Sequence, residues 1–172
     1  MDCIEAIMTR RSIRKYQEAE VPQEDLITIL EAGRWAPSAG NYQPCYFVVV
    51  DDANKRKELQ EAAYGQEILN TAPLVIVVCA DPQRTSEYGE RGMKLWCLLD
   101  CANAAQNMLL AAHALGYGSC WMGGFSESGV KKVLGLPEDF RVMALIPIGK
   151  AAEEPDPRPR RPLDEMVRRN QW

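Results

Sequence analysis

The chain has 172 residues, of which 47% are hydrophobic and 26% charged, a composition typical of a folded globular domain rather than a disordered or disulfide-stapled one. A single domain over residues 1–172 is expected at this length, with enough chain to bury a substantial core. Asp and Glu outnumber Lys and Arg by 24 to 20, and the resulting net charge of −4 argues against a general nucleic-acid surface.

The N-terminal segment predicts a short helix over residues 2–9, followed by extended chain. It contains neither a basic leader nor a long apolar run, so no secretory signal is expected and the protein is predicted to be cytoplasmic. Six cysteines are scattered without paired spacing, which predicts free thiols in such a protein. With a single histidine, His113, neither a metal site nor a Ser–His–Asp triad is expected.

A cluster of cations follows this first helix, in residues 10–15. In extended chain alternate side chains share a face, so Arg10, Ser12 and Arg14 would point one way. Ile13 would then turn toward the core. Two guanidinium groups and a hydroxyl in a row suit a phosphate. The alternative is structural, because cations also collect at helix C-termini, where the macrodipole favours them.

Helices and apolar strands alternate through the next part of the chain. A proline and two acids in residues 21–25 predict the start of a helix that ends before Pro37. Residues 36–44, APSAGNYQP, predict a loop with many amide and hydroxyl groups between two prolines. The elements predicted next are a strand over 46–50, a helix over 53–63 capped by Asp52, and a strand over 74–80 buried on both faces.

The longest predicted helix spans residues 93–115 and is apolar nearly all round. Asp100 and other polar residues interrupt it too often for a membrane span, so a core helix is predicted. One domain of this size would leave part of it uncovered, which favours a subunit interface. The elements predicted after it are a strand over 119–125 that breaks at a glycine pair, a helix over 126–134 and a strand over 141–148.

The C-terminal segment changes character after Lys150. Four prolines in eight residues, 155–162, predict an extended arm over residues 151–172 rather than a packed element. Residues 163–169 would add a turn or two of helix. The whole pattern predicts one α+β domain with a reaching tail.

Four segments together resemble the flavin-dependent nitroreductase family: RRSIRKY at 10–16, PSAGNYQP at 37–44, WMGGF at 121–125 and RPRRPL at 158–163. They follow the family's order along essentially the whole chain. The resemblance implies a nitroreductase-like α+β fold with a central, mostly antiparallel sheet flanked by helices. It also implies an obligate homodimer, in which the C-terminal arm is exchanged onto the partner subunit and FMN binds at the interface.

The resemblance also assigns FMN contacts by position. Arg10, Arg11 and Ser12 would hold the phosphate and the ribityl chain. Arg14 would lie at the pyrimidine edge of the flavin, where negative charge develops on reduction.

Further FMN contacts are implied for other parts of the chain. Met122, Gly123 and Gly124 would pass close to the ring, because glycine permits that approach and a backbone N–H can reach flavin N5. Arg160 or Arg161 of the arm would reach the phosphate. The remaining positions are Pro37, Ser38 and Ala39 of the other subunit at the dimethylbenzene end, Asn41 and Gln43 fixing that loop, and Gln66 at the polar edge.

The implied activity is that of an FMN-dependent oxidoreductase. NAD(P)H would be the transient electron donor, and a nitroaromatic, quinone or similar conjugated small molecule the acceptor, visiting the same open flavin face in a ping-pong scheme through N5. No protein group is indicated as a catalytic acid or base. No GxGxxG motif follows a strand, so a Rossmann dinucleotide site is not expected.

Three alternatives stay open at this point. The chain could perform other flavin chemistry found in related proteins, such as reductive dehalogenation or ene-reduction. It could bind flavin without catalysis. The arginine cluster could also be purely structural.

Overall fold

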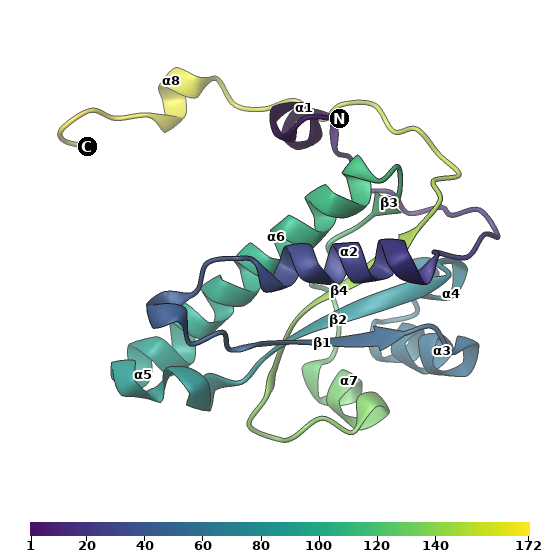
Figure 1. The fold of residues 1–172 in the computed structure, drawn as a ribbon, viewed down its shortest axis with the longest axis horizontal. Helices are drawn as coiled ribbons and strands as arrows, with labels where there is room; N and C mark the ends of the chain where they lie inside the picture. Colours follow the sequence, from purple (N-terminus) through teal and green to yellow (C-terminus); the bar gives the residue numbers. More distant parts are fainter.

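The structure, a computed structural model, describes all residues 1–172. Its centre is a four-stranded antiparallel sheet in the order β1-β2-β4-β3 (Figure 1). The strands are β1 (Cys45–Val50), β2 (Leu74–Ala80), β3 (Gly118–Ser119) and β4 (Arg141–Gly149). The α+β class and the mostly antiparallel sheet predicted above are confirmed.

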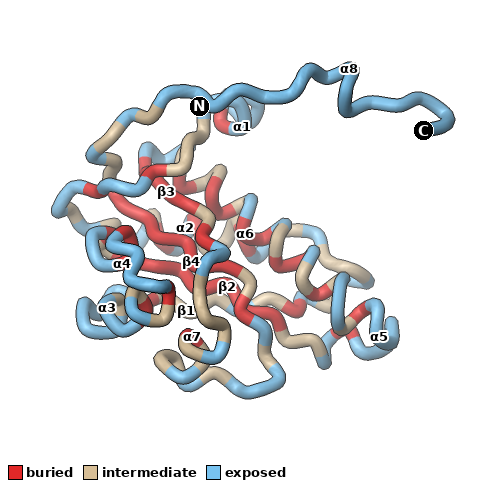
Figure 2. Tube along the Cα trace, turned by 180° about the vertical axis from the view of Figure 1, so that it is seen from behind, coloured by how far each residue is buried: buried red, intermediate tan, exposed pale blue.

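Strand β2 lies inside the sheet, and all seven of its residues are buried. Its side chains alternate, so that Leu74, Ile76 and Val78 face one apolar layer while Val75 and Val77 face the other. Each large apolar side chain buried in this way contributes about 1.5–3 kcal/mol. Figure 2 shows the buried strands enclosed within the body of the molecule.

Helices cover both faces of the sheet. On one face α2 (Gln23–Arg34) and α6 (Cys97–Ala114) pack against each other. The opposite face is covered by α3 (Ala53–Ala62), α4 (Ile68–Thr71) and α7 (Glu127–Leu134). As predicted, the Asp52 side chain caps α3 by accepting a backbone N–H, at 2.8 Å.

Short helical turns connect β2 to α6. They are η2 (Pro82–Tyr88), α5 (Gly89–Arg91) and η3 (Gly92–Trp96), the last a π-helical turn that runs into α6. The long helix predicted over 93–115 is therefore present, with an irregular first turn. Leu95 and Leu99 remain 41% and 51% exposed, so one face of this helix is uncovered in the single chain. No helix is both long and apolar enough to cross a bilayer.

The strand predicted over 119–125 is wrong in its length, because β3 covers only Gly118–Ser119. The chain nevertheless continues beside β4 in the same register as far as Met122. There Met122 and Leu145 exchange two backbone hydrogen bonds, of 2.9 and 3.1 Å. Residues 118–122 thus follow β4 closely even where regular strand pairing is interrupted.

The regular pairing is interrupted because residue 147 of β4 is a proline. Its carbonyl accepts the Cys120 N–H at 3.3 Å, but proline has no N–H to return. One rung of the ladder is missing at that point. Beyond Met122 the chain leaves the sheet at Gly123 and Gly124, called the glycine pair below.

The N-terminal segment follows α1 (Cys3–Thr9) and runs as extended chain along β3. The Ile13 N–H donates to the Ser119 carbonyl at 3.0 Å. Ile13 is buried, as predicted, and packs where Gly118 has no side chain: a Cβ there would lie 2.8 Å from three Ile13 atoms. Residues 10–14, called the cation strand below, are therefore held in place by backbone pairing and by one buried side chain.

The C-terminal arm begins where β4 leaves the sheet. Gln17 N–H donates to Lys150 O, and Ala152 N–H to Lys15 O, both at 2.9 Å, so the start of the arm pairs with the chain after the cation strand. From Asp156 onward every residue is exposed, and Figure 1 shows the arm running past α1 and away from the body. Helix α8 (Leu163–Met166) is a single turn, shorter than the predicted 163–169.

Candidate active site

The cation strand presents three polar side chains on one face. Arg10, Ser12 and Arg14 each influence the pKa of the Cys120 thiol, which agrees with the alternation of side chains expected in extended chain. Burial raises the pKa of Cys120, and these three neighbours oppose the rise. The predicted use of these two guanidinium groups and the hydroxyl as one binding face stays a prediction.

Arg10 carries an unpaired polar atom. Its Nη1 is fully buried and has no hydrogen-bond partner. Burial lowers the pKa of Arg10, and the neighbouring charges of Arg11 and Arg160 lower it further. The buried hydroxyl of Ser119 is also unpartnered. Since unpaired buried donors are costly, this set of groups fits an anion such as a phosphate.

The other two arginines of the cation strand are arranged differently. Arg11 donates to two nearby backbone carbonyls, each at 2.9 Å, and lines a cavity of about 550 Å³ together with His113. Burial lowers the pKa of His113, and both Arg10 and Arg11 lie near enough to lower it further. Arg14 donates its backbone N–H to the carboxylate of Glu153 at 2.5 Å, while its side chain remains exposed.

The arm also brings a cation toward this face. Arg160 lies near enough to Arg10 of the same chain to affect its pKa. Its guanidinium otherwise donates only to backbone carbonyls of the arm itself, at 3.0 and 3.3 Å. Arg161 is exposed and has no such relation to Arg10 in this chain.

The glycine pair lies at the other end of the segment that borders the cation strand. Ser119 and Gly123 are four residues apart, about 13 Å in extended chain. A Cβ on Gly123 would meet nothing within 4 Å, so its backbone is open to the approach of a planar group. Gln66 donates its side-chain amide to Gly124 O at 2.7 Å, which holds the pair against the end of α3.

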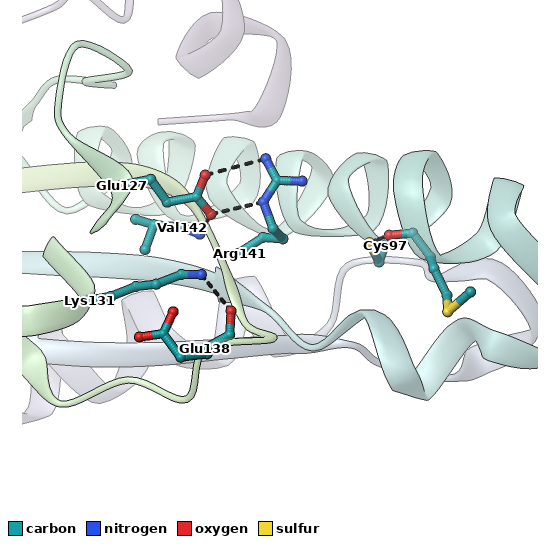
Figure 3. Close-up of polar contacts among 7 residues, drawn as sticks. Cys97, Glu127, Lys131, Glu138, Arg141 and Val142 are labelled. Carbon is teal, nitrogen blue, oxygen red and sulfur yellow. Dashed lines mark hydrogen bonds and ion pairs between the residues drawn. The ribbon is translucent and has the colours of Figure 1, made fainter. Parts of the chain in front are cut away.

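Helix α7 begins three residues after Gly124 and is bonded to the start of β4. Figure 3 shows Glu127, at the start of α7, making two contacts of 2.8 and 3.3 Å with the Arg141 guanidinium. Glu127 also accepts the Val142 N–H at 2.9 Å. Burial raises the pKa of Glu127, but Arg141 and the Val142 N–H outweigh burial, and the pKa lies below its usual value. The glycine pair is thus bonded to Gln66 on one side and followed by a helix that Glu127 ties to β4.

The 36–44 loop closes largely on itself. Gln43 donates its backbone N–H to Ser38 Oγ at 3.1 Å and its side-chain amide to Asn41 O and Oδ1 at 3.2 Å. Gly40, Asn41 and Gln43 have φ values of 55°, 60° and 50°, in the left-handed region. Non-glycine residues held there cost on the order of 1–3 kcal/mol each. Asn41 and Gln43 therefore fix the loop within the chain, whatever else they contact.

Asp100 of α6 anchors this loop, and sequence reasoning did not include it in the site. Both of its carboxylate oxygens accept the Ala39 N–H, at 3.1 Å, and the residue is only 6% exposed. Burial raises the pKa of Asp100, and the Ala39 N–H opposes the rise. The available signal was a lone acid within a strongly apolar helix, which needs a buried partner.

The cation strand and the 36–44 loop lie at opposite ends of α6. At one end Asp100 holds the loop, and at the other the His113 ring contacts Thr9 Oγ at 2.8 Å, next to the cation strand. A helix rises about 1.5 Å per residue, so these two points are about 20 Å apart. One chain brings the cation strand, the glycine pair and Gln66 together, and leaves Pro37, Ser38 and Ala39 at the far end.

The fold is an α+β domain whose antiparallel sheet is bordered by the cation strand and the glycine pair. The chain belongs to the nitroreductase family: the model described as the Nitroreductase family matches residues 7–67 and 61–150. The family predicted from the four sequence segments is therefore confirmed, and with it the oxidoreductase class.

Individual relatives agree with this membership. A protein of Archaeoglobus fulgidus named NADH dehydrogenase/NAD(P)H nitroreductase is 40% identical over 159 residues, covering 90% of this chain and 88% of the relative. The NADPH-flavin oxidoreductase of Vibrio harveyi is 34% identical, covering 98% of this chain and 74% of the relative.

Solved structures show the same fold. The NADPH:FMN oxidoreductase of Vibrio harveyi, complexed with NAD⁺, has a TM-score of 0.91 at 34% identity and covers 98% of this chain and 77% of its own. An NADH dehydrogenase/NAD(P)H nitroreductase from Parabacteroides distasonis has a TM-score of 0.87 at 29% identity, with 98% of both chains covered.

Proposed function

We propose that this protein is an FMN-dependent oxidoreductase that passes electrons from NAD(P)H to nitroaromatics, quinones or similar conjugated acceptors. The buried, unpartnered Nη1 of Arg10 carries the proposal, because a buried cationic donor without a partner is costly until an anion such as the FMN phosphate satisfies it. The glycine pair supports it from the other end of the same short segment. Relatives named as NADPH-flavin and NADPH:FMN oxidoreductases support FMN as the cofactor.

The side chains of the cation strand would bind the phosphate end of FMN. Arg10 and Ser12 would contact the phosphate and ribityl chain, with Arg11 adding charge from the neighbouring side of the strand. Arg160 or Arg161 of the arm would add a further cation. The backbone of the cation strand is held in place before the ligand arrives, so little reorganisation of that strand opposes binding.

The flavin ring would extend toward the glycine pair. The backbone at Met122, Gly123 and Gly124 would approach it, and Gln66 would keep Gly124 in position. Arg14 would place positive charge at the pyrimidine edge, where negative charge develops. Bound FMN would supply the redox chemistry, accepting hydride at N5 from NAD(P)H and passing electrons to the acceptor.

The complete site would need a second copy of the chain. Pro37, Ser38 and Ala39 would serve the dimethylbenzene end of the partner's flavin, which suits their place at the far end of α6 from the cation strand. The exposed Leu95 and Leu99 supply apolar surface for a homodimer interface. The single domain would extend its arm, residues 151–172, onto the partner.

Spectroscopy of the purified protein tests the cofactor and the reaction. The protein should be yellow, and NADH or NADPH added without oxygen should bleach its visible absorption until a nitroaromatic or quinone is added. Bound FMN that neither nicotinamide bleaches would indicate binding without catalysis. A colourless protein that also binds no added FMN would contradict the proposal.

Two further measurements test the assembly and the acceptor. Light scattering should give about twice 19.3 kDa, and a stable monomer that still binds FMN would contradict the shared site. A screen that includes halogenated phenols and conjugated enones separates nitro or quinone reduction from dehalogenation and ene-reduction. The acceptor with the largest kcat/KM identifies the reaction.

A further inference from the structure

Three cysteines gather where the 36–44 loop enters β1. Cys45 is the first residue of β1, and Cys97 and Cys101 stand one turn apart on α6. All three belong to the apolar layer between the sheet and α6, and all three thiols are free. The proposed flavin chemistry uses none of them.

The strand register places the Cys45 side chain. Cys45 lies opposite Ala80 of β2, and the neighbouring Asp81 N–H donates to Pro44 O at 2.9 Å. Cys45 and Ala80 are therefore a non-hydrogen-bonded pair, with Cα atoms about 4.5 Å apart and side chains close together on the face toward α6.

Cys101 reaches the same point from the helix. Its Sγ lies 3.5 Å from the carbonyl oxygen of Cys79, the residue that leads into Ala80. The sulfur of Cys101 thus lies beside the place on β2 that Cys45 faces, which makes the two residues neighbours, and the Cys45 thiol raises the pKa of Cys101.

The three thiols differ in access and in partners. The Cys97 thiol donates to the Met93 carbonyl, one turn earlier in the chain, at 2.9 Å. Figure 3 shows Cys97 on the helix, away from the Glu127–Arg141 pair. Cys101 is fully buried. Cys45 is half-buried and lines a cavity of about 250 Å³ behind the loop, together with Ser38 and Gln43. Only Cys45 combines access from this cavity with a thiol neighbour.

We propose that Cys45 and Cys101 are a redox-active pair that closes to a reversible disulfide when peroxide enters this cavity. Hydrogen peroxide would oxidise the Cys45 thiol to a sulfenic acid and release one water. The Cys101 sulfur would then attack the Cys45 sulfur, forming the disulfide and releasing water. Overall, two thiols and one peroxide give one disulfide and two waters.

The order of the two steps follows from the environments of the thiols. Peroxide entering the cavity reaches Cys45, which lines it, and not Cys101, which is fully buried. The Cys45 thiol and burial also raise the pKa of Cys101, which makes Cys101 the slower of the two thiols toward peroxide. Cys101 therefore acts second, on the sulfenic acid that forms beside it. The bond would tie the end of the 36–44 loop to the residue that follows Asp100, so the loop would be held at two points of α6.

Peptide mapping of the full-length protein tests the pairing. Trypsin releases Cys45 in the peptide 35–55, and Cys97, Cys101 and Cys120 in the peptide 95–131. After peroxide treatment and alkylation, unreduced digests should contain these two peptides cross-linked. The cross-link should be lost in Cys101→Ser and kept in the matched variants Cys97→Ser and Cys120→Ser.

Thermal unfolding gives an independent readout. Peroxide should raise the midpoint by about 5 °C, reversibly with dithiothreitol, in the unchanged chain and in Cys97→Ser, but not in Cys45→Ser. A cross-link that persists in Cys101→Ser, or a Cys45 found only as free thiol or sulfinic acid, would overturn the proposal. Peptide mass depends on neither flavin nor turnover, so failure here leaves the proposed function standing.

Discussion

The cation strand and the 36–44 loop differ in whether their polar groups have hydrogen-bond partners within the chain. The cation strand has an ordinary extended backbone, paired to β3, but the Arg10 side chain keeps a buried donor without a partner. The polar groups of the loop hydrogen-bond to one another and to Asp100. Asn41 and Gln43 have φ values in the left-handed region. The first arrangement is suited to binding an anion, and the second to presenting a fixed shape.

Among the substitutions considered, Arg10→Ala should have the largest effect, and the effect should be on FMN affinity. FMN affinity should fall by about 10- to 100-fold, since a hydrogen bond to a charged group is worth about 1.5–3 kcal/mol. The free energy of unfolding without FMN should not fall, because the substitution removes a guanidinium group that has a buried donor without a partner. Fluorescence titration with FMN measures the first effect and urea unfolding the second.

The control for Arg10 is Lys57→Ala, on the exposed outer face of α3. It removes the same charge and should change neither affinity nor stability. An Arg10→Ala protein that binds FMN normally but unfolds more easily would make Arg10 a structural residue.

Alanine substitutions at two glycines distinguish the packing that supports the cation strand from the open space proposed for the flavin ring. Gly118→Ala places a Cβ 2.8 Å from Ile13 atoms, and should cost about 1–3 kcal/mol in unfolding free energy and weaken FMN binding. Gly123→Ala enters open space and should weaken FMN binding with no loss of stability. Urea midpoints and FMN titrations of both variants test this, and unchanged affinity in Gly123→Ala would place the ring elsewhere.

Asp100→Ala tests the anchor of the loop. It leaves the Ala39 N–H without its acceptor and should cost about 1–2 kcal/mol, while Asp100→Asn retains a carbonyl oxygen and should cost less. The folded pKa of Asp100 is raised, so its contribution to stability is full below the ordinary value of 3.8 and is lost as pH rises through the folded pKa.

Urea midpoints measured across that pH range check the sign for Asp100. The Asn variant should lack the decline, because it has no proton to lose. Identical pH profiles for the two proteins would show that the carboxyl does not titrate differently in the fold.

Glu127→Gln should have the smallest effect and the opposite pH dependence. Its loss should cost about 0.5–1.5 kcal/mol at pH 7, since the ion pair is partly exposed but also accepts a backbone N–H. The folded pKa of Glu127 is lowered, so its contribution is full above the ordinary value of 4.5 and is lost as pH falls through the folded pKa. Acid unfolding checks this, with the exposed Glu58→Gln as a control that should change little.

Local sequence patterns predicted those parts of the fold that local physics determines. The seven apolar residues of β2 and the Asp52 cap are each visible within a few positions of sequence. The alternation predicted for Arg10, Ser12 and Arg14 is equally local, and all three influence the pKa of Cys120. The shared-subunit contacts rest on resemblance and remain predictions.

The features that escaped prediction depend on long-range pairing. Asp100 and Ala39 are 61 residues apart, and nothing local shows that they meet. Pro147 was visible in the sequence, but its effect on the predicted strand depends on lying opposite Cys120. Register between distant strands is set by the whole sheet, so the early end of β3 could not be read from its own residues.

Helix α6 also constrains which changes in chain length the protein can tolerate. One residue inserted between Asp100 and His113 would rotate one end by about 100° relative to the other and shift it by about 1.5 Å. After that rotation, the Asp100 bond to Ala39 and the His113 bond to Thr9 could not both form. Insertions and deletions compatible with both ends are therefore confined to segments outside this helix, such as the turns over 82–96 and the arm.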